Sequence, residues 1–144
     1  MRVTLVLALL LSLHLIFNSC STSKATVAAN YPEEQLGWKL GAQAYTFNRF
    51  TFAEALDKIE SCGLRYIEIF PGQMIGDGSD ERIGADLSAA GRAKMKKLAK
   101  HKNITMQAFG VVGAKDAQEW ERVFQFAQEM GVQVISVEPS NKHL

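Results

Sequence analysis

Hydrophobic and polar positions follow two periods along residues 38–139, and the two periods alternate in a fixed order. Short apolar stretches typical of strands are each followed by a segment with apolar residues every three or four positions, which is typical of helices. The predicted strands are 39–47, 64–70, 104–112 and 132–139, and the predicted helices are 51–63, 86–102 and 116–131. This alternation predicts right-handed βαβ crossovers and a parallel sheet, so the fold class is α/β.

The predicted helices carry clear end signals and one apolar face each. Thr51 with Glu54 forms a capping box, and Gly63 and Gly131 are expected stops. Gly91 is expected to weaken the second helix slightly. The expected apolar positions are Phe52, Ala55, Leu56 and Ile59 in the first helix, Leu87, Ala90, Met95, Leu98 and Ala99 in the second, and Trp120, Val123, Phe124 and Ala127 in the third.

Two architectures compete for this order of elements, an open doubly wound sheet and a (β/α)₈ TIM barrel. The turn after the first strand, "TFNRFT", contains no glycine, and neither G-x-G-x-x-G nor a Walker motif occurs in the chain. Their absence favours the barrel. A complete barrel takes about 250 residues. We therefore expect residues 38–144 to form the first four (β/α) units, a half-barrel that is the N-terminal part of a longer protein.

Strand alternation separates a face toward the helices from a face toward the barrel interior. Ile67 and Ile69 form a plain helix-facing pair, which fixes the interior face of the second strand. The expected interior residues are Gln43, Tyr45 and Phe47 on the first strand, Tyr66, Glu68 and Phe70 on the second, Thr105, Gln107 and Phe109 on the third, and Ser136 and Glu138 on the fourth. Polar groups late in the strands lie where barrel enzymes place their chemistry.

Glutamines and aromatic rings at such a mouth suit sugar binding, through hydroxyl hydrogen bonds and ring-face stacking. The substrate-binding candidates are Gln43, Tyr45, Glu68, Phe70, Gln107 and Glu138. The alternative role for the aromatic rings is packing within the protein. Gln43 and Gln107 could instead hydrogen-bond to each other. Glu68 could form a structural ion pair with Arg65 or Lys39.

Glu138 is the metal-ligand candidate, because it ends a strand and precedes Pro139. A metal site needs about three or four ligands, so one glutamate does not complete it. No residue is assigned a catalytic role.

The first twenty residues predict an export signal rather than part of the fold. Arg2 precedes an apolar stretch of about fifteen residues, which is shorter than the roughly twenty that span a bilayer. Ser19-Cys20 resembles a bacterial lipoprotein processing site, which predicts lipidation of Cys20. Ordinary cleavage near Ala28-Ala29 is the alternative. We expect residues 21–37 to be a flexible tether and the domain to lie on the periplasmic side of a bacterial membrane, anchored by lipid.

Composition and net charge limit the classes of partner that we expect the chain to bind. The chain is 47% hydrophobic and 22% charged with a net charge of +1, as in an ordered globular protein without nucleic-acid-binding character. The basic residues between 92 and 102 are expected to form a solvated helix face. With Cys20 lipidated, Cys62 is left as a structural thiol without a disulfide partner.

Two segments resemble a known family. The segments "LGAQAYTFNRFTFAEALDKIESCGLRYIEIFPGQ" (40–73) and "EWERVFQFAQEMGVQVISVEP" (119–139) are similar to the sugar phosphate isomerase/epimerase family of xylose isomerase-like TIM barrels, in particular to its exported branch. The resemblance implies Mn²⁺ or Mg²⁺ held by Glu, Asp and His at strand ends, and acid–base proton transfer beside a carbonyl.

In that family, most metal ligands and the catalytic pair come from strands five to eight. We therefore expect this chain alone to hold no metal and to show no epimerase activity. Export favours a free sugar over a phosphorylated one as ligand. The alternatives are a lyase or hydrolase acting on oxidised sugars, and a non-catalytic sugar-binding half-barrel that pairs with a second half-barrel or with a second copy of itself.

Overall fold

The computed structural model describes residues 31–138. Its elements are α2 (Pro32–Gln35), β1 (Gly41–Gln43), the 3₁₀ helix η1 (Ala44–Phe47), α3 (Phe52–Ser61), β2 (Tyr66–Ile69), α4 (Ala89–His101), β3 (Thr105–Val112), α5 (Ala117–Met130) and β4 (Val134–Val137). The predicted signal segment, Cys20, most of the tether and Pro139 lie outside the described residues. No helix within residues 31–138 is long and apolar enough to cross a membrane.

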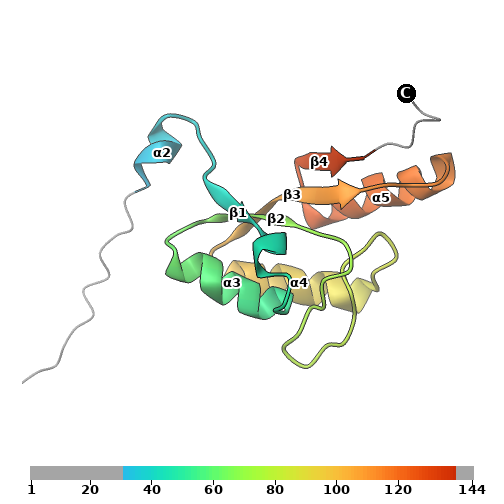
Figure 1. Ribbon diagram of the computed structural model, residues 1–144, viewed down its shortest axis with the longest axis horizontal. Helices are drawn as coiled ribbons and strands as arrows, with labels where there is room; N and C mark the ends of the chain where they lie inside the picture. The colour runs from blue at the N-terminus through green and yellow to red at the C-terminus, as the bar shows by residue number, and fades with distance from the viewer. Residues whose placement is uncertain (1–30, 139–144) are drawn as a thin grey trace, which may run out of the picture. The chain divides into compact units, whose positions relative to one another are not determined.

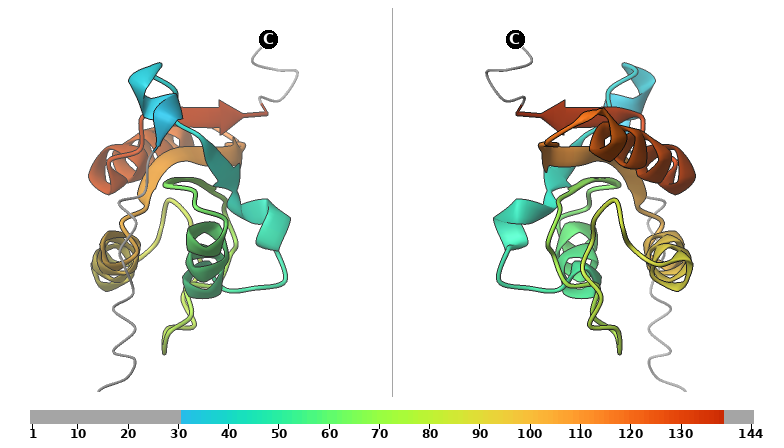
Figure 2. Two further views of the ribbon diagram at one scale, coloured as in Figure 1. Left: turned by 90° about the vertical axis from the view of Figure 1, so that its left-hand side faces the viewer. Right: turned by 90° about the vertical axis from the view of Figure 1, so that its right-hand side faces the viewer.

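The four strands form one parallel sheet in the order β1-β2-β3-β4 (Figure 1). The helices α3, α4 and α5 lie along one side of this curved sheet (Figure 2). The predicted α/β class and parallel sheet are therefore confirmed. Consecutive strands are neighbours throughout, without the reversal of strand order that marks a doubly wound sheet. The arrangement is consistent with a half-barrel of β/α units.

The helix ends follow the predicted signals closely. Glu54 N donates to Thr51 Oγ1 at 3.3 Å and Thr51 N donates to Glu54 Oε2 at 2.8 Å, so the capping box at the start of α3 is present. Gly131 ends α5 in the left-handed conformation, with φ of 73°. The helix α4 starts later than predicted, because Ser88 is its N-cap and accepts from Gly91 N at 3.0 Å.

Two predicted helix faces need correction. Phe124 is 54% exposed, because α5 turns Val123, Phe126, Ala127 and Met130 toward the core instead. In α4, Ala90 is exposed, and Gly91 is buried where a Cβ would meet Leu87 Cδ1 at 2.5 Å. Gly91 therefore permits close packing at the start of α4, a benefit that helix propensity alone does not show.

The first strand is shorter than predicted, since 39–47 contains only the three residues of β1 before the chain turns into η1. The turn is closed by Asn48 N donating to Tyr45 O at 3.1 Å and Phe50 N donating to Phe47 O at 2.9 Å. Tyr45 and Phe47 therefore do not continue the strand face of Gln43, as the alternation had predicted.

The strand β3 contains two irregularities that change which way its side chains face. Its partner positions step from Ile67–Met106 to Glu68–Ala108, and then from Phe109–Ile135 to Val112–Val137. Each step adds a residue to β3, as in a β-bulge, and an added residue reverses the alternation that follows it. The predicted interior position of Phe109 is therefore wrong: it is 1% exposed and its ring centroid lies 4.9 Å from that of Phe126.

Candidate functional site

The face of the sheet away from the helices carries most of the predicted site residues. Gln43 lies level with Glu68, and Glu68 lies level with Ala108 on the next strand. The predicted faces of β2 are confirmed, because Ile67 and Ile69 are buried while Glu68 and the residues two positions either side of it are half-buried. We call this polar side the interior face.

A polar cleft of about 200 Å³ lies on the interior face toward the N-terminal ends of the strands. Its polar side chains are Lys39, Gln43, Tyr66, Glu68 and Gln107.

Hydrogen bonds fix one side of this polar cleft. Lys39 Nζ donates to Gln107 Oε1 at 3.1 Å and to Gln133 Oε1 at 2.7 Å, and Gln107 Nε2 donates to Gln133 Oε1 at 3.0 Å. Gln107 therefore pairs with Gln133 rather than with Gln43. Sequence reasoning missed Gln133, whose only signal was its position at the start of the last predicted strand.

Glu68 reaches across the sheet in the same cleft. Its Oε1 accepts from Ser136 Oγ at 2.8 Å, which links β2 to β4 over β3. A Cβ at Gly110 would lie 2.5 Å from Ser136 Cβ, so only glycine on β3 allows this approach. The alternative ion pair of Glu68 is not formed within residues 31–138, since Arg65 pairs with Glu34 at 3.4 Å and Lys39 bonds to Gln107 and Gln133.

An aromatic cleft of about 310 Å³ adjoins the polar cleft toward the C-terminal ends of the strands. Its lining residues are Gln43, Tyr45, Phe70, Pro71, Gly110 and Val111. The rings of Tyr45 and Phe70 meet edge to face with centroids 5.2 Å apart. Although Tyr45 has left the strand, η1 returns it to this cleft with 57% of the residue exposed. Gln43 lines both clefts and joins them.

The hydroxyl of Tyr66 is held at the N-terminal end of the polar cleft. Burial raises the pKa of Tyr66, and the hydrogen bond that its hydroxyl donates to Glu34 Oε1 at 3.2 Å raises it further. Tyr66 therefore stays a neutral donor near neutral pH. Its partner lies on α2, which Figure 1 shows at the N-terminal end of β1.

Glu138 lies apart from the other predicted site residues. Its backbone N–H donates to Val112 O at 3.0 Å, its side chain is exposed, and it lines neither cleft. Residues 31–138 contain no group of three or more His, Cys, Asp or Glu side chains that could hold a metal ion. The described donor set therefore does not fit the divalent metal implied by the family resemblance.

No protein-family model and no curated protein matches the chain. Among solved structures, the chain is similar to the crystal structure of an uncharacterised protein from Parabacteroides distasonis ATCC 8503, with a TM-score of 0.68 and 34% sequence identity. The match covers 72% of this chain and 44% of that chain. The chain thus spans less than half the length of this structural neighbour, with which it shares its α/β fold.

Proposed function

We propose that the interior face is the sugar-binding face of a sugar isomerase/epimerase-like (β/α)₈ barrel. The observation that carries the proposal is the pair of adjoining clefts that share Gln43, one lined by amide, ammonium and carboxylate groups and the other by aromatic rings. A monosaccharide offers hydroxyls at its rim and an apolar C–H surface on its ring. A concave site with a few convergent polar groups and an aromatic wall matches both.

The position of the aromatic cleft supports the same function. Tyr45 follows β1 and Phe70 follows β2, so the aromatic cleft lies at the C-terminal ends of parallel strands. Barrel enzymes bind their substrates at this end. More than half of the Parabacteroides distasonis chain lies outside the match, which suits a protein in which these four strands are one part of a larger sheet.

The residues of the polar cleft suit binding and orientation of the sugar. The amide of Gln43 offers both a donor and an acceptor, and the second oxygen of Glu68 stays available while its Oε1 accepts from Ser136. In this proposal residues 31–138 hold the sugar, and we assign proton transfer beside the carbonyl to none of them.

A non-catalytic sugar-binding half-barrel that pairs with a second copy is the second candidate. The strands β1 and β4 each have a neighbour on one side only within the described residues. Val134 and Val137 on β4 are half-exposed. Open edges and exposed apolar side chains of this kind invite pairing with another sheet.

Calorimetric titration of the full chain with neutral monosaccharides (glucose, fructose and xylose) tests the proposal. We expect binding, and we expect Gln43→Ala to weaken it about tenfold, because the amide contacts are lost. Gln125→Ala, an exposed position on α5, is the matched control and should leave affinity unchanged. No binding of any sugar, or equal effects of the two substitutions, would contradict the proposal.

Analytical ultracentrifugation of the full chain, with and without sugar, separates the two candidates. Sugar binding by a monomer would support the isomerase/epimerase-like barrel. Sugar binding by a stable dimer would support the second candidate.

A further inference from the structure

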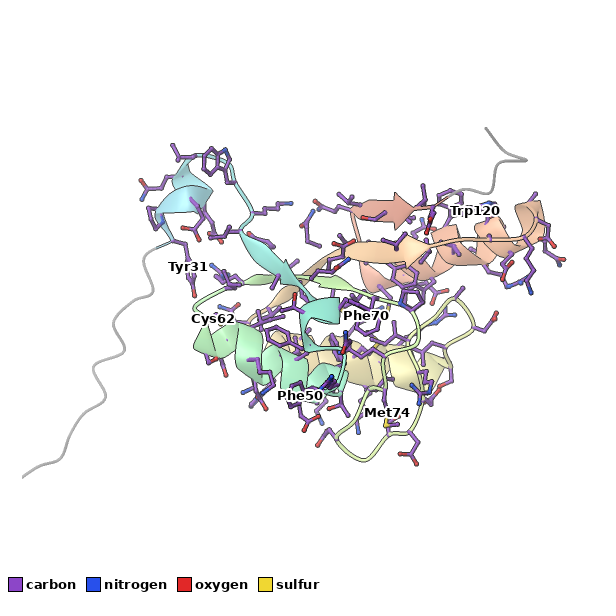
Figure 3. All side chains as sticks on the ribbon, in the orientation of Figure 1. Tyr31, Phe50, Cys62, Phe70, Met74 and Trp120 are labelled. Carbon is purple, nitrogen blue, oxygen red and sulfur yellow. The ribbon has the colours of Figure 1, made fainter. Side chains whose placement is uncertain are left out.

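A third cleft, of about 240 Å³, lies beside the aromatic cleft and shares Phe70 with it. It is formed between the loop that follows η1 and the loop that follows β2, and we call it the arginine cleft after Arg49 and Arg82 in its lining. Figure 3 shows Phe50 and Met74 on these two loops and Phe70 nearer the sheet.

Backbone hydrogen bonds hold the walls of the arginine cleft in place. The first N–H groups of α3 donate to the loop after β2: Phe52 N to Met74 O at 2.8 Å and Ala53 N to Ile75 O at 3.0 Å. The same loop bonds to itself through Gly72 N, which donates to the carbonyl of residue 83 at 2.8 Å. The cleft is therefore preformed, which lowers the entropic cost of binding a ligand.

Gln73 holds one wall of the arginine cleft in place. The residue is 3% exposed, and its Nε2 donates to Phe50 O at 3.2 Å, which ties the loop after β2 to the loop after η1. Its Oε1 is buried away from solvent, so Gln73 shapes the wall and does not contact a ligand in the cleft.

The charges around the arginine cleft favour an anion. Within the described part of the chain, neither Arg49 nor Arg82 forms an ion pair, and Arg82 Nη1 donates to Gly72 O at 2.7 Å. Hydrogen bonds from Thr51 N and Oγ1, each 2.8 Å long, lower the pKa of the third charged residue, Glu54, which keeps it ionised. The lining therefore carries two guanidinium groups and one carboxylate, and the ammonium of Lys58, 3.9 Å from the centroid of the Phe50 ring, adds a further positive charge beside it.

We infer that the arginine cleft binds the carboxylate of a sugar acid, with Arg49 and Arg82 as donors. Phe70 is common to the arginine and aromatic clefts, so the sugar ring extends from one into the other. The inference rests on the proposed function for the placement of the ring. A planar carboxylate matches the fork of N–H donors that a guanidinium group presents.

Titration of the full chain with glucuronate and with glucose tests this inference. We expect glucuronate to bind about tenfold more tightly than glucose, since hydrogen bonds to charged groups are the stronger ones. Arg49→Gln and Arg82→Gln should each weaken glucuronate binding more than glucose binding and so reduce this preference. Lys96→Gln on α4 is the matched control, because Lys96 is exposed, forms no ion pair among the described residues and lines none of the three clefts.

The outcomes separate the inference from the proposed function. If glucose binds and glucuronate binds no more tightly, the inference is overturned and the proposed function stands. If neither sugar binds, both are overturned. Tighter binding of glucose 6-phosphate than of glucuronate would overturn the assignment to a carboxylate. Arg82→Gln could disturb the loop, because it removes the hydrogen bond to Gly72 O. Arg49 makes no hydrogen bond among the described residues, so Arg49→Gln tests the inference without this effect.

Discussion

The two faces of the sheet differ in the burial and the polarity of their side chains. The helix-facing side is built from fully buried apolar residues such as Ile67, Ile69 and Phe109. The interior face is built from half-buried polar side chains such as Gln43 and Glu68, with hydrogen bonds that run across strands. The first face therefore provides most of the buried apolar core, and the proposed ligand contacts lie on the second.

The strand β3 serves both faces within a few residues. Phe109 is 1% exposed in the helix-facing core, whereas Val111, two positions later, is 51% exposed in the aromatic cleft. In a regular strand these two side chains would share a face. The extra residue in β3 between Phe109 and Val112 separates them, so Val111 turns to the interior face while Phe109 stays in the core.

Phe109→Ala should have the largest effect on stability. Loss of this buried ring and its contact with Phe126 is expected to lower the free energy of unfolding by about 3–5 kcal/mol. Val111→Ala, on the interior face, should change it by no more than about 0.5 kcal/mol. Urea denaturation followed by circular dichroism measures both, and equal losses would contradict the division between the faces.

Gly76→Ala should be the next most damaging change, because it strains the loop that walls the arginine cleft. Gly76 has φ of 76°, and a Cβ there would lie 2.5 Å from Thr51 Oγ1. We expect a loss of about 2–4 kcal/mol from strain and overpacking together.

Gly63→Ala is the control for Gly76→Ala, since it has φ of 72° with nothing within 4 Å of the added Cβ. It should lose only the conformational cost of about 1–2 kcal/mol. If both variants unfold at the same urea concentration, the close approach of the loop to Thr51 does not matter for stability.

Thr51→Ala should have a smaller effect, through loss of the α3 cap. The hydroxyl accepts from Glu54 N and also donates to the Glu54 carboxylate. Removal of such a cap costs about 1 kcal/mol. Ser61→Ala at the other end of α3 is the control. An unchanged thermal midpoint for Thr51→Ala would show that the cap contributes nothing.

Glu54→Gln should change how the free energy of unfolding depends on pH more than it changes the free energy of unfolding at neutral pH. Hydrogen bonds from Thr51 lower the pKa of Glu54 below its usual 4.5, so the unfolded chain binds more protons at this carboxyl than the folded chain does. This stabilisation is present above pH 4.5 and is lost as the pH falls through the folded-state pKa. Urea denaturation between about pH 3 and pH 7 should show a shallower acid loss for Glu54→Gln than for the wild type. Identical acid limbs would refute the assigned cause.

The sequence predicted the elements better than it predicted the faces. The capping box at Thr51 and the alternation around Ile67 and Ile69 are local signals, and both are confirmed. The sequence could not show which face of the sheet Phe109 occupies, because the added residue of a β-bulge has no recognisable signal in an apolar strand. Phe124 was wrongly assigned to the core face. Four apolar residues define the rotation of a helix about its axis only to within about one residue position.

The candidate site was predicted in part for a similar reason. Gln43, Glu68 and Gln107 lie in one cleft as strand alternation suggested, whereas Glu138 lies outside it. The arginine cleft was not predicted, because Arg49 and Gln73 lie on two loops that are far apart in the chain and meet only in the fold. Only the packing of the loop after β2 against the start of α3 creates that proximity.

Chemical-shift mapping by two-dimensional NMR tests most directly whether the interior face binds sugar. Saturating the ¹⁵N-labelled full chain with glucose should shift the side-chain amide signals of Gln43 and Gln107 and the backbone amide of Phe70. The amides of Phe126 and Gln125 on α5 should stay in place. Shifts confined to α5, or no shifts at all, would contradict the assignment of ligand contact to the interior face.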